Sequence, residues 1–308
     1  MTGAHSKRIA SLAALLAASS LGGCKTVAVR SLADALSSGG GDAYASDDDP
    51  DLVRAAIPFG LKTMEGVLPQ EPRHVGLLTS LVSGFTSYSY AFVAADADLA
   101  DLDGRVADAR QLHLRAKKLF LRARAYGLRG LDVRHAGMDE ALRGVKDVPE
   151  ALAAATKQDV PLLYWTASAW ALAIAHGKDD MQLVAELPAP VAMMERALAL
   201  DEAWGAGALH EFFVTYDATR SAPQGGGPER ARAHMERALQ LCLNQKLGPH
   251  VAWAEGVLVQ TQNRPEFTRV LEDVLRADPE AWPKYRLANV LAQRRARELL
   301  AHADDLFL

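Results

Sequence analysis

Beyond about residue 52, the apolar positions of the chain lack the alternation of apolar and polar residues that marks β-strands. Runs rich in Val, Ile and Thr are nearly absent, and Ala, Leu, Arg and Glu dominate. Helix-breaking residues divide the chain into segments of about 12 to 25 residues, and the breaks fall at Gly127, Gly177 to Asp179, residues 223–228, Gly248-Pro249 and Asp278-Pro279. The pattern therefore predicts an all-α fold built from helical hairpins.

An internal repeat sharpens this prediction. The segment Met194–Leu200 recurs as Met235–Leu241, at an offset of 41 residues. A frame of three residues surrounds both segments. Its first residue is followed four positions later by a large apolar residue, and three positions after that by a smaller residue. The frame occurs at Ala116, Phe120, Ala123; at Pro190, Met194, Ala197; at Ala231, Met235, Ala238; and at Phe267, Leu271, Val274. On a helix these positions share one face, where small residues let a neighbouring helix approach closely.

The repeat favours a helical hairpin array, a tetratricopeptide-like α-solenoid, over residues 52–308. In that family the second helix of each hairpin carries a similar frame and often ends in Asp-Pro, as Asp278-Pro279 does here. The first helices match the family poorly, with only Trp165 and Trp170 hinting at its pattern. The alternative is an irregular helical bundle in which the matching segments are a coincidence of an Ala/Leu/Arg-rich composition.

The N-terminus has the pattern of a bacterial lipoprotein signal. Lys7 and Arg8 precede an apolar run, Ile9 to Leu21, that is too short to span a bilayer. The run closes in Leu21-Gly22-Gly23-Cys24, a lipobox. We expect residues 1–23 to be a signal peptide and Cys24 to carry the lipid of a protein anchored in a membrane leaflet and facing the periplasm. The alternative is an ordinary secretory signal with an incidental cysteine.

Residues 24–51 are rich in Ser, Gly and Asp and are expected to form a flexible tether. Lys25 follows the lipidated cysteine in place of the Asp that often signals inner-membrane retention, so the outer membrane is the expected location. Removing residues 1–23 takes the formal charge from −4 to −6. Without a basic surface the chain is not expected to bind nucleic acid.

No pattern of catalytic or metal-ligating residues stands out. His210 has no second histidine four residues on, Ser168 does not lie in a nucleophile elbow, and residues 225–227 lack the Lys and Ser/Thr of a phosphate-binding loop. Cys242 lies in an apolar stretch, as expected for a buried, inert thiol. The sequence therefore predicts a protein that is not an enzyme and needs no cofactor or metal.

Several polar or aromatic residues within apolar helices are candidates to line a ligand cavity or pore: Tyr164, Trp165, Trp170, His210, Glu211, Arg286 and Asn289. Each group has a structural alternative. The aromatic residues can fill gaps between hairpins. The pair at 210 and 211 can form a helix cap or a cross-helix ion pair, because a buried charge needs a partner. The pair at 286 and 289 can belong to a hydrogen-bond network between repeats.

The C-terminal two thirds resembles the T component of tripartite ATP-independent periplasmic (TRAP) transporters, a family of lipoproteins with tetratricopeptide-like folds. The order and spacing of several segments carry the resemblance: Pro161–Trp170, Gly205–Phe212, Ala233–Ala238, Phe267–Pro279, Leu287–Asn289 and Ala296–Phe307. The glycine-rich stretch Gln224 to Gly227 departs from the family pattern.

The resemblance implies an accessory of a TRAP transporter that docks a periplasmic solute-binding protein and handles a small organic or hydrophobic ligand. A lipid tether would raise the local concentration of such a module for a partner in the same compartment. The alternative is a general tetratricopeptide-like scaffold lipoprotein for envelope protein assembly, with protein clients and no small ligand. A homo-oligomer with cyclic symmetry is open to either.

Overall fold

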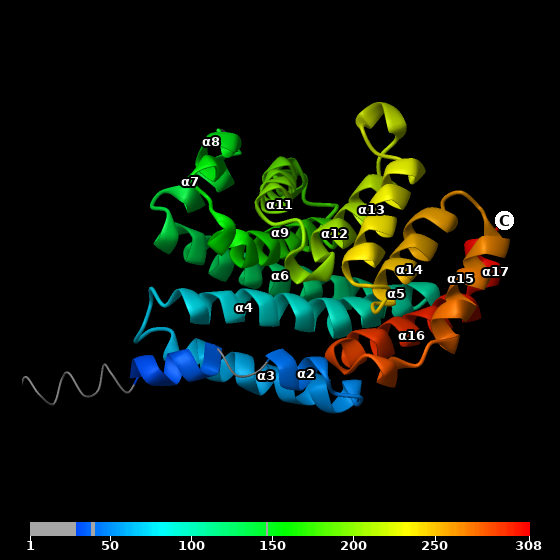
Figure 1. Ribbon diagram of the computed structural model, residues 1–308, viewed down its shortest axis with the longest axis horizontal. Helices are drawn as coiled ribbons and strands as arrows, with labels where there is room; N and C mark the ends of the chain where they lie inside the picture. The colour runs from blue at the N-terminus through cyan, green and yellow to red at the C-terminus, as the bar shows by residue number, and fades with distance from the viewer. Residues whose placement is uncertain (1–28, 38–40, 146) are drawn as a thin grey trace, which may run out of the picture.

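The computed structural model describes residues 29–37, 41–145 and 147–308, and every regular element among them is a helix. The predicted all-α fold is therefore confirmed for the described part of the chain. Helical hairpins follow one another in chain order (Figure 1). Their arms are α4 (Val75–Tyr88) with α6 (Val106–Arg134), α9 (Val160–Ala175) with α11 (Pro188–Leu200), α12 (Ala208–Ala218) with α13 (Pro228–Leu241), and α14 (Gly248–Trp253) with α15 (Arg264–Arg276).

The repeat frame read from the sequence falls on the second arm of each hairpin, in α6, α11, α13 and α15. All of its twelve positions are buried, and Met235, at 9% exposure, is the most accessible of those given a value. The frame therefore marks the faces by which the hairpins stack, as the repeat predicted. In the described residues the array has two apolar cores, which meet within α12 between Phe213 and Val214.

The first hairpin is longer than the others. After α4 the chain continues without interruption through a π-helical segment, η1 (Ser89–Ala94), into α5 (Ala95–Leu102). A turn at Gly104, which has a φ of +68°, then reverses the chain into α6. A second π-helical segment, η5 (Ala254–Leu258), extends α14. Such π segments shift the faces of a helix and are frequent at functional sites.

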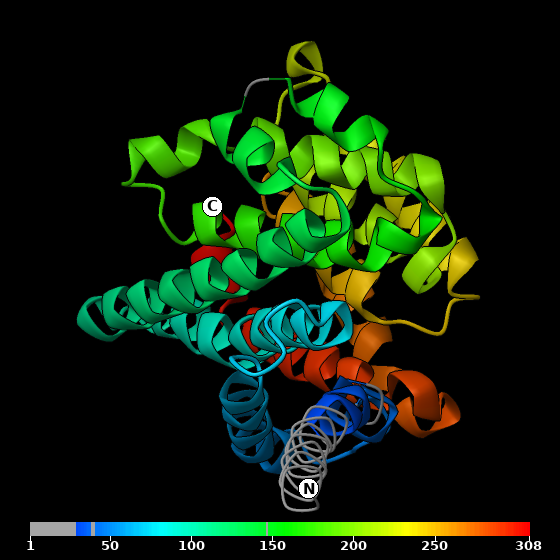
Figure 2. The ribbon, with the colours of Figure 1, turned by 90° about the vertical axis from the view of Figure 1, so that its left-hand side faces the viewer.

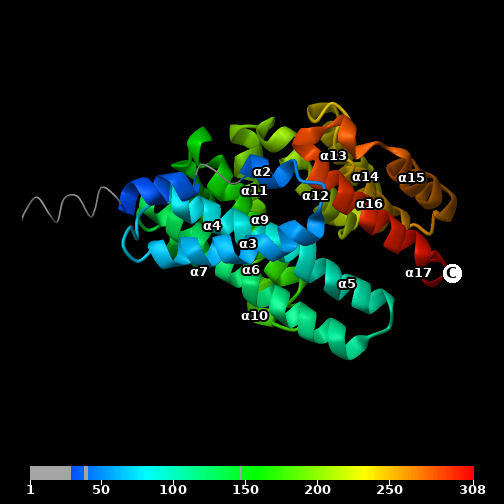
Figure 3. The same ribbon diagram turned by 90° about the horizontal axis from the view of Figure 1, so that it is seen from below.

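The array closes on itself. Helix α16 (Arg286–Ala301) lies beside α2 (Gly41–Ala45) and α3 (Pro50–Val67), so the last long helix meets the first (Figures 1 and 3). In Figure 2 the colours run around the molecule, from blue at the bottom through green at the top to orange beside the blue helices. Arg286 donates to the backbone oxygen of Ser46 at 3.0 Å, and Arg294 pairs with Asp51 at 3.4 Å. The solenoid is a closed turn and not an open arc.

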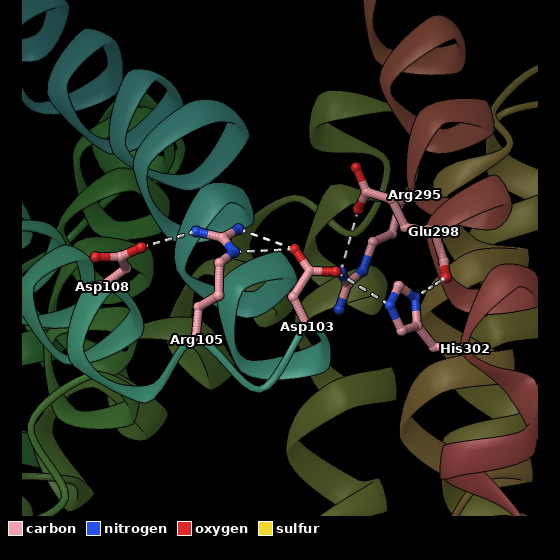
Figure 4. A network of polar contacts seen from close by, with 6 residues as sticks. All are labelled: Asp103, Arg105, Asp108, Arg295, Glu298 and His302. Atoms are coloured by element: carbon pink, nitrogen blue, oxygen red, sulfur yellow. Dashed lines mark hydrogen bonds and ion pairs between the residues drawn. The ribbon is translucent and has the colours of Figure 1, made fainter.

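The long hairpin is joined to the C-terminus at its tip. Asp103, in the turn between α5 and α6, accepts from Arg105 at 2.9 Å and lies 3.2 Å from His302 (Figure 4). His302 follows α16 and precedes α17 (Ala303–Leu306), and its other ring nitrogen contacts the backbone oxygen of Glu298 at 2.9 Å. These contacts bring together residues almost 200 positions apart in the chain.

Shorter helices complete the connections. They are α7 (Met138–Gly144), α8 (Val148–Ala153), α10 (Met181–Ala185) and the 3-10 turns η2 (Lys157–Asp159), η3 (Trp204–Ala206), η4 (Ala222–Gln224), η6 (Pro279–Ala281) and η7 (Pro283–Tyr285). The glycine-rich stretch forms a defined turn after η4, in which the amide of Gly227 donates to Asp217 O at 2.8 Å.

The break predicted at Gly127 is wrong, because α6 runs through this residue. A Cβ built at Gly127 would lie 2.0 Å from Thr166 Oγ1 on α9. The glycine is therefore needed for close contact between two helices and does not end one.

Among the described residues, part of the tether expected over residues 24–51 is helical. Residues 29–37 are helical, Ala33 is fully buried, and His74 Nε2 contacts Asp34 at 2.9 Å. Asp49 caps α3 by accepting from the amides of Asp51 and Leu52 at 3.0 Å. The lipobox and Cys24 lie outside the described residues. Among the described residues, none of the helices combines the length and apolar character needed to cross a membrane.

Candidate functional site

Tyr90 combines an exposed side chain with a strongly raised pKa. Its side chain lies on the π-helical segment η1 and exposes 63% of its surface, yet burial by surrounding protein raises its pKa to about 12. Both observations fit a side chain that water can reach although other protein groups lie near it. The phenol is therefore exposed to water and still lies close enough to other protein groups for them to raise its pKa.

The charges that act on Tyr90 come from several parts of the array. After burial, the negative charges of Glu255 in η5, Asp98 in α5 and Glu211 in α12 raise its pKa further, and Arg295 in α16 opposes them. Elements from the beginning, middle and end of the described chain thus face one space. We call the group formed by Tyr90, Tyr164, Glu211 and Lys246 the central recess.

An ion pair crosses one wall of the central recess. Lys246 Nζ lies 2.8 Å from Glu211 Oε1 and donates to the backbone oxygen of Gly205 at 2.8 Å. The ammonium also lies 5.6 Å from the centre of the Tyr285 ring, within the range of a cation–π contact. The two side chains keep 15% and 29% of their surfaces exposed. This wall therefore carries opposite charges that compensate each other.

Aromatic side chains form the neighbouring wall. The Tyr164 ring packs edge-on against Trp165, with centroids 4.9 Å apart, and lies 4.7 Å from the Trp204 ring of η3. Burial, followed by the charge of Glu211 and by Tyr90, raises the pKa of Tyr164. The charge of Glu211 thus acts on both phenols, and Tyr90 acts on Tyr164, so that this part of the array combines aromatic rings with a few polar groups.

Three of the residues that the sequence singled out, Tyr164, Trp165 and Glu211, thus lie at or next to the central recess. Trp170 does not, because its side chain is fully buried. Its indole Nε1 donates to Glu186 at 2.8 Å, and the Arg124 guanidinium stacks 4.8 Å from its ring. Trp170 therefore fills the core between hairpins, as the structural alternative for the aromatic residues stated.

His210 is buried and paired away from the central recess. Its Nδ1 lies 2.8 Å from Nδ1 of His234 on α13, and its Nε2 lies 3.2 Å from Glu202. Burial lowers the pKa of His210, against the opposing effect of Glu202. The histidine thus joins α12 to α13, which is the cross-helix role named as its alternative.

Arg286 and Asn289 hold chain segments together. Besides Ser46, Arg286 pairs with Glu280 at 2.5 Å. Asn289 is fully buried, and its amide accepts from Leu247 N and donates to Gln245 O, both at 2.9 Å. This is the network between repeats that the sequence left open as their alternative.

Tyr90, Lys246, Trp204 and Tyr285 contribute to the central recess but were missed by the sequence reasoning. Tyr90 stands in the segment Tyr88-Ser89-Tyr90, which reads like any apolar helix because a π-helical shift has no clear sequence signal. Lys246 lies in a loop, and its partner on α12 is 35 positions away. Only the closed fold brings these residues together.

Comparisons with known proteins agree with this architecture. A model of the family described as TRAP transporter T-component matches residues 46–307. The chain belongs to this family. This T component is also 31% identical, over 267 residues, to an uncharacterized protein of Treponema pallidum strain Nichols. That match covers 86% of this chain and 82% of the relative.

The match to the family model covers the helices that form the closed turn. It begins at Ser46, whose backbone oxygen binds Arg286, and it includes all four hairpins and α16. The family assignment therefore covers the elements that line the central recess. A T component is an accessory of a TRAP transport system.

Proposed function

We propose that this T component is a non-enzymatic lipoprotein that docks a periplasmic solute-binding protein of a TRAP system and handles a small organic ligand in the central recess. The single observation that carries the ligand part is Tyr90, an exposed phenol whose pKa is raised to about 12 by surrounding protein atoms and by the charges of Glu255, Asp98 and Glu211. Membership of the T-component family supports the link to TRAP transport.

The chemistry of the walls favours a ligand with an apolar body. Tyr164, Trp165 and Trp204 offer aromatic faces, while Lys246 is already compensated by Glu211 and by a backbone oxygen. Binding a strongly charged ligand here would require breaking that ion pair, which costs free energy in a partly buried site. Apolar surface with a small number of placed polar groups is typical of small-molecule sites.

The anchor and the location belong to the same proposal. The lipobox supports acylation of Cys24, and Lys25 supports the outer membrane. A module held at the membrane in this way would meet a soluble binding protein at high local concentration.

The docking part is tested by cross-linking in the envelope. The full-length tagged protein is expressed in its own host, cells are treated with formaldehyde, and partners are identified by mass spectrometry. A Cys24→Ala variant, which we expect to lose membrane association, serves as the control for proximity due to the anchor. We expect a solute-binding protein of the TRAP type to be enriched with the wild-type protein. Recovery of envelope assembly factors without any binding protein would contradict docking and favour the scaffold alternative.

A further inference from the structure

A second cluster of chemistry-bearing side chains lies near the tip of the long hairpin. Asp98 and Asp101 stand three positions apart on α5 and so share one face of that helix. His113 on the facing helix α6 lies 2.7 Å from Asp101 through its Nε2 atom. One ligand atom from each of the three residues lies within 4.8 Å of the other two.

The imidazole of His113 is held in place from its other side. Its Nδ1 atom lies 2.8 Å from Nδ1 of His176, the residue that follows α9. The Phe120 ring stacks on His176, with centroids 5.5 Å apart. A ligating histidine commonly has its second ring nitrogen bound to an orienting group in this way. His176 thus fixes the direction in which His113 Nε2 points.

The contacts of the described residues give the Asp98 carboxylate no structural role. Among the described residues it forms neither a hydrogen bond nor an ion pair, although it is partly buried. The cation that lowers its pKa most, Arg295, is already engaged by Glu255 and, at 3.3 Å, by Glu298. The carboxylates of Asp98 and Asp101 therefore meet beside the His113 imidazole, and no Lys or Arg side chain in the described part of the chain pairs with both.

We propose that Asp98, Asp101 and His113 bind a divalent transition-metal ion of the Zn²⁺ type, with His176 as the residue that positions His113. Two oxygen ligands and one imidazole nitrogen suit zinc, which takes three protein ligands and a water in open sites. Tetrahedral ligands stand about 3.4 Å apart, given Zn–N and Zn–O distances near 2.1 Å. The three groups, now within 4.8 Å of one another, would have to move closer together by side-chain rotation to reach that spacing.

Water can reach the site, so an ion can enter. A pocket of about 290 Å³ is lined by Asp101, His113 and His176 together with Val106, Arg110 and Asp179. The site joins α5 to α6 just before the turn whose Asp103 contacts His302 (Figure 4). The metal would therefore brace the hairpin tip on which the C-terminal helices rest.

The chain offers a matched control in its other histidine pair. His210 and His234 also meet through their Nδ1 atoms at 2.8 Å, with ring centroids 5.0 Å apart, as in the first pair. There the carboxylate of Glu202 is bound by Arg237, and Asp217 is bound by Arg230 at 3.3 Å. The second pair therefore has the imidazoles without a free set of carboxylates.

The test is Co²⁺ binding by the full-length protein in detergent after treatment with EDTA, followed by visible absorption and by displacement with Zn²⁺. We expect one saturable Co²⁺ site per chain, lost in Asp98→Asn and in the more exposed Asp101→Asn, and unchanged in His210→Gln. His176→Gln should weaken binding by about 10–100-fold, as for other residues that orient a ligand.

Circular dichroism checks that each variant is folded, and Asp101→Asn keeps the test decisive if Asp98→Asn is not. Absence of a saturable Co²⁺ spectrum in the wild-type protein would overturn the proposal. Equal binding by the wild-type protein and folded Asp101→Asn would overturn it as well.

Discussion

The ammonium of Lys246 lies 2.8 Å from the Glu211 carboxylate and 2.8 Å from the backbone oxygen of Gly205. One side chain from the loop before α14 thus joins helix α12 and the turn η3. The same side chain faces the Tyr285 ring, in the segment that leads into α16. Lys246 therefore connects the third hairpin to the end of the chain and fixes one wall of the central recess.

Replacing Lys246 should lower the free energy of unfolding by an amount that depends on whether the Glu211 carboxylate is present. In Lys246→Met, the Glu211 carboxylate remains partly buried without its cation, so we expect the free energy of unfolding to fall by about 1–3 kcal/mol. Adding Glu211→Gln removes the uncompensated charge and should restore part of the loss. Urea unfolding of the four proteins of this double-mutant cycle gives the coupling, expected to be on the order of 1 kcal/mol. Strict additivity of the two changes would mean that the pair is not coupled.

Gly127 should be intolerant of the smallest side chain. Because a Cβ there would lie 2.0 Å from Thr166 Oγ1, Gly127→Ala forces α6 and α9 apart, and we expect a loss of about 1–3 kcal/mol. Gly66 in α3 is the control, since a Cβ there meets nothing within 4 Å. Gly66→Ala should stabilise the protein by about 0.5–1 kcal/mol through backbone entropy. If Gly127→Ala unfolded at a higher temperature than Gly66→Ala, the close contact between α6 and α9 would be refuted.

The repeat frame makes a prediction at Ala238, which is fully buried on α13. Ala238→Trp places a large side chain where α13 passes η3 and α12, and we expect the midpoint of thermal unfolding to drop by several degrees or the protein to fail to fold. Ala233 is exposed on the same helix, so Ala233→Trp should leave the midpoint nearly unchanged. Similar midpoints for both variants would argue against the frame as a packing surface.

The His210–His234 pair predicts a dependence of stability on pH. Burial lowers the pKa of both residues. Glu202 opposes this shift at His210, and Asp217 opposes it at His234. Below about pH 6.5 the unfolded chain takes up protons that the folded pair resists, so the free energy of unfolding falls as the pH decreases from 7 to 5. Arg230 and Arg237 add to this effect. His234→Gln should show a smaller slope in urea unfolding over this range, and an unchanged slope would contradict the assignment.

The sequence predicted the local part of the fold well for a physical reason. Packing faces between adjacent hairpins depend on residues three and four positions apart, such as Ala231, Met235 and Ala238, and this spacing is written in the chain. Caps and breaks, such as Pro249 at the start of α14, are equally local. The prediction at Gly127 is wrong because a glycine in a sequence indicates either a helix break or a close contact between helices. Only the position of the neighbouring helix distinguishes the two.

The central recess and the closure of the array could not be predicted in the same way. Contacts such as Arg286 with Ser46 and His302 with Asp103 join residues about 200 or more positions apart, and their geometry depends on the small rotation between successive hairpins. Of the aromatic candidates, Tyr164 faces the central recess while Trp170 fills the core, because residues six apart point to different sides of α9. Tyr90 owes its place to a π-helical segment.

The enclosure of Tyr90 is the claim on which the ligand proposal rests, and thiol labelling of Tyr90→Cys tests it most directly. Cys242 is buried and Cys24 is the expected lipidation site, so the introduced thiol is the reactive one. Phe59→Cys, on the open face of α3 where Phe59 is 79% exposed, is the control. We predict that a small methanethiosulfonate labels both variants, whereas a maleimide attached to a large polyethylene glycol labels only Phe59→Cys. Equal labelling of both variants by the large reagent would place Tyr90 on an open surface and contradict the central recess.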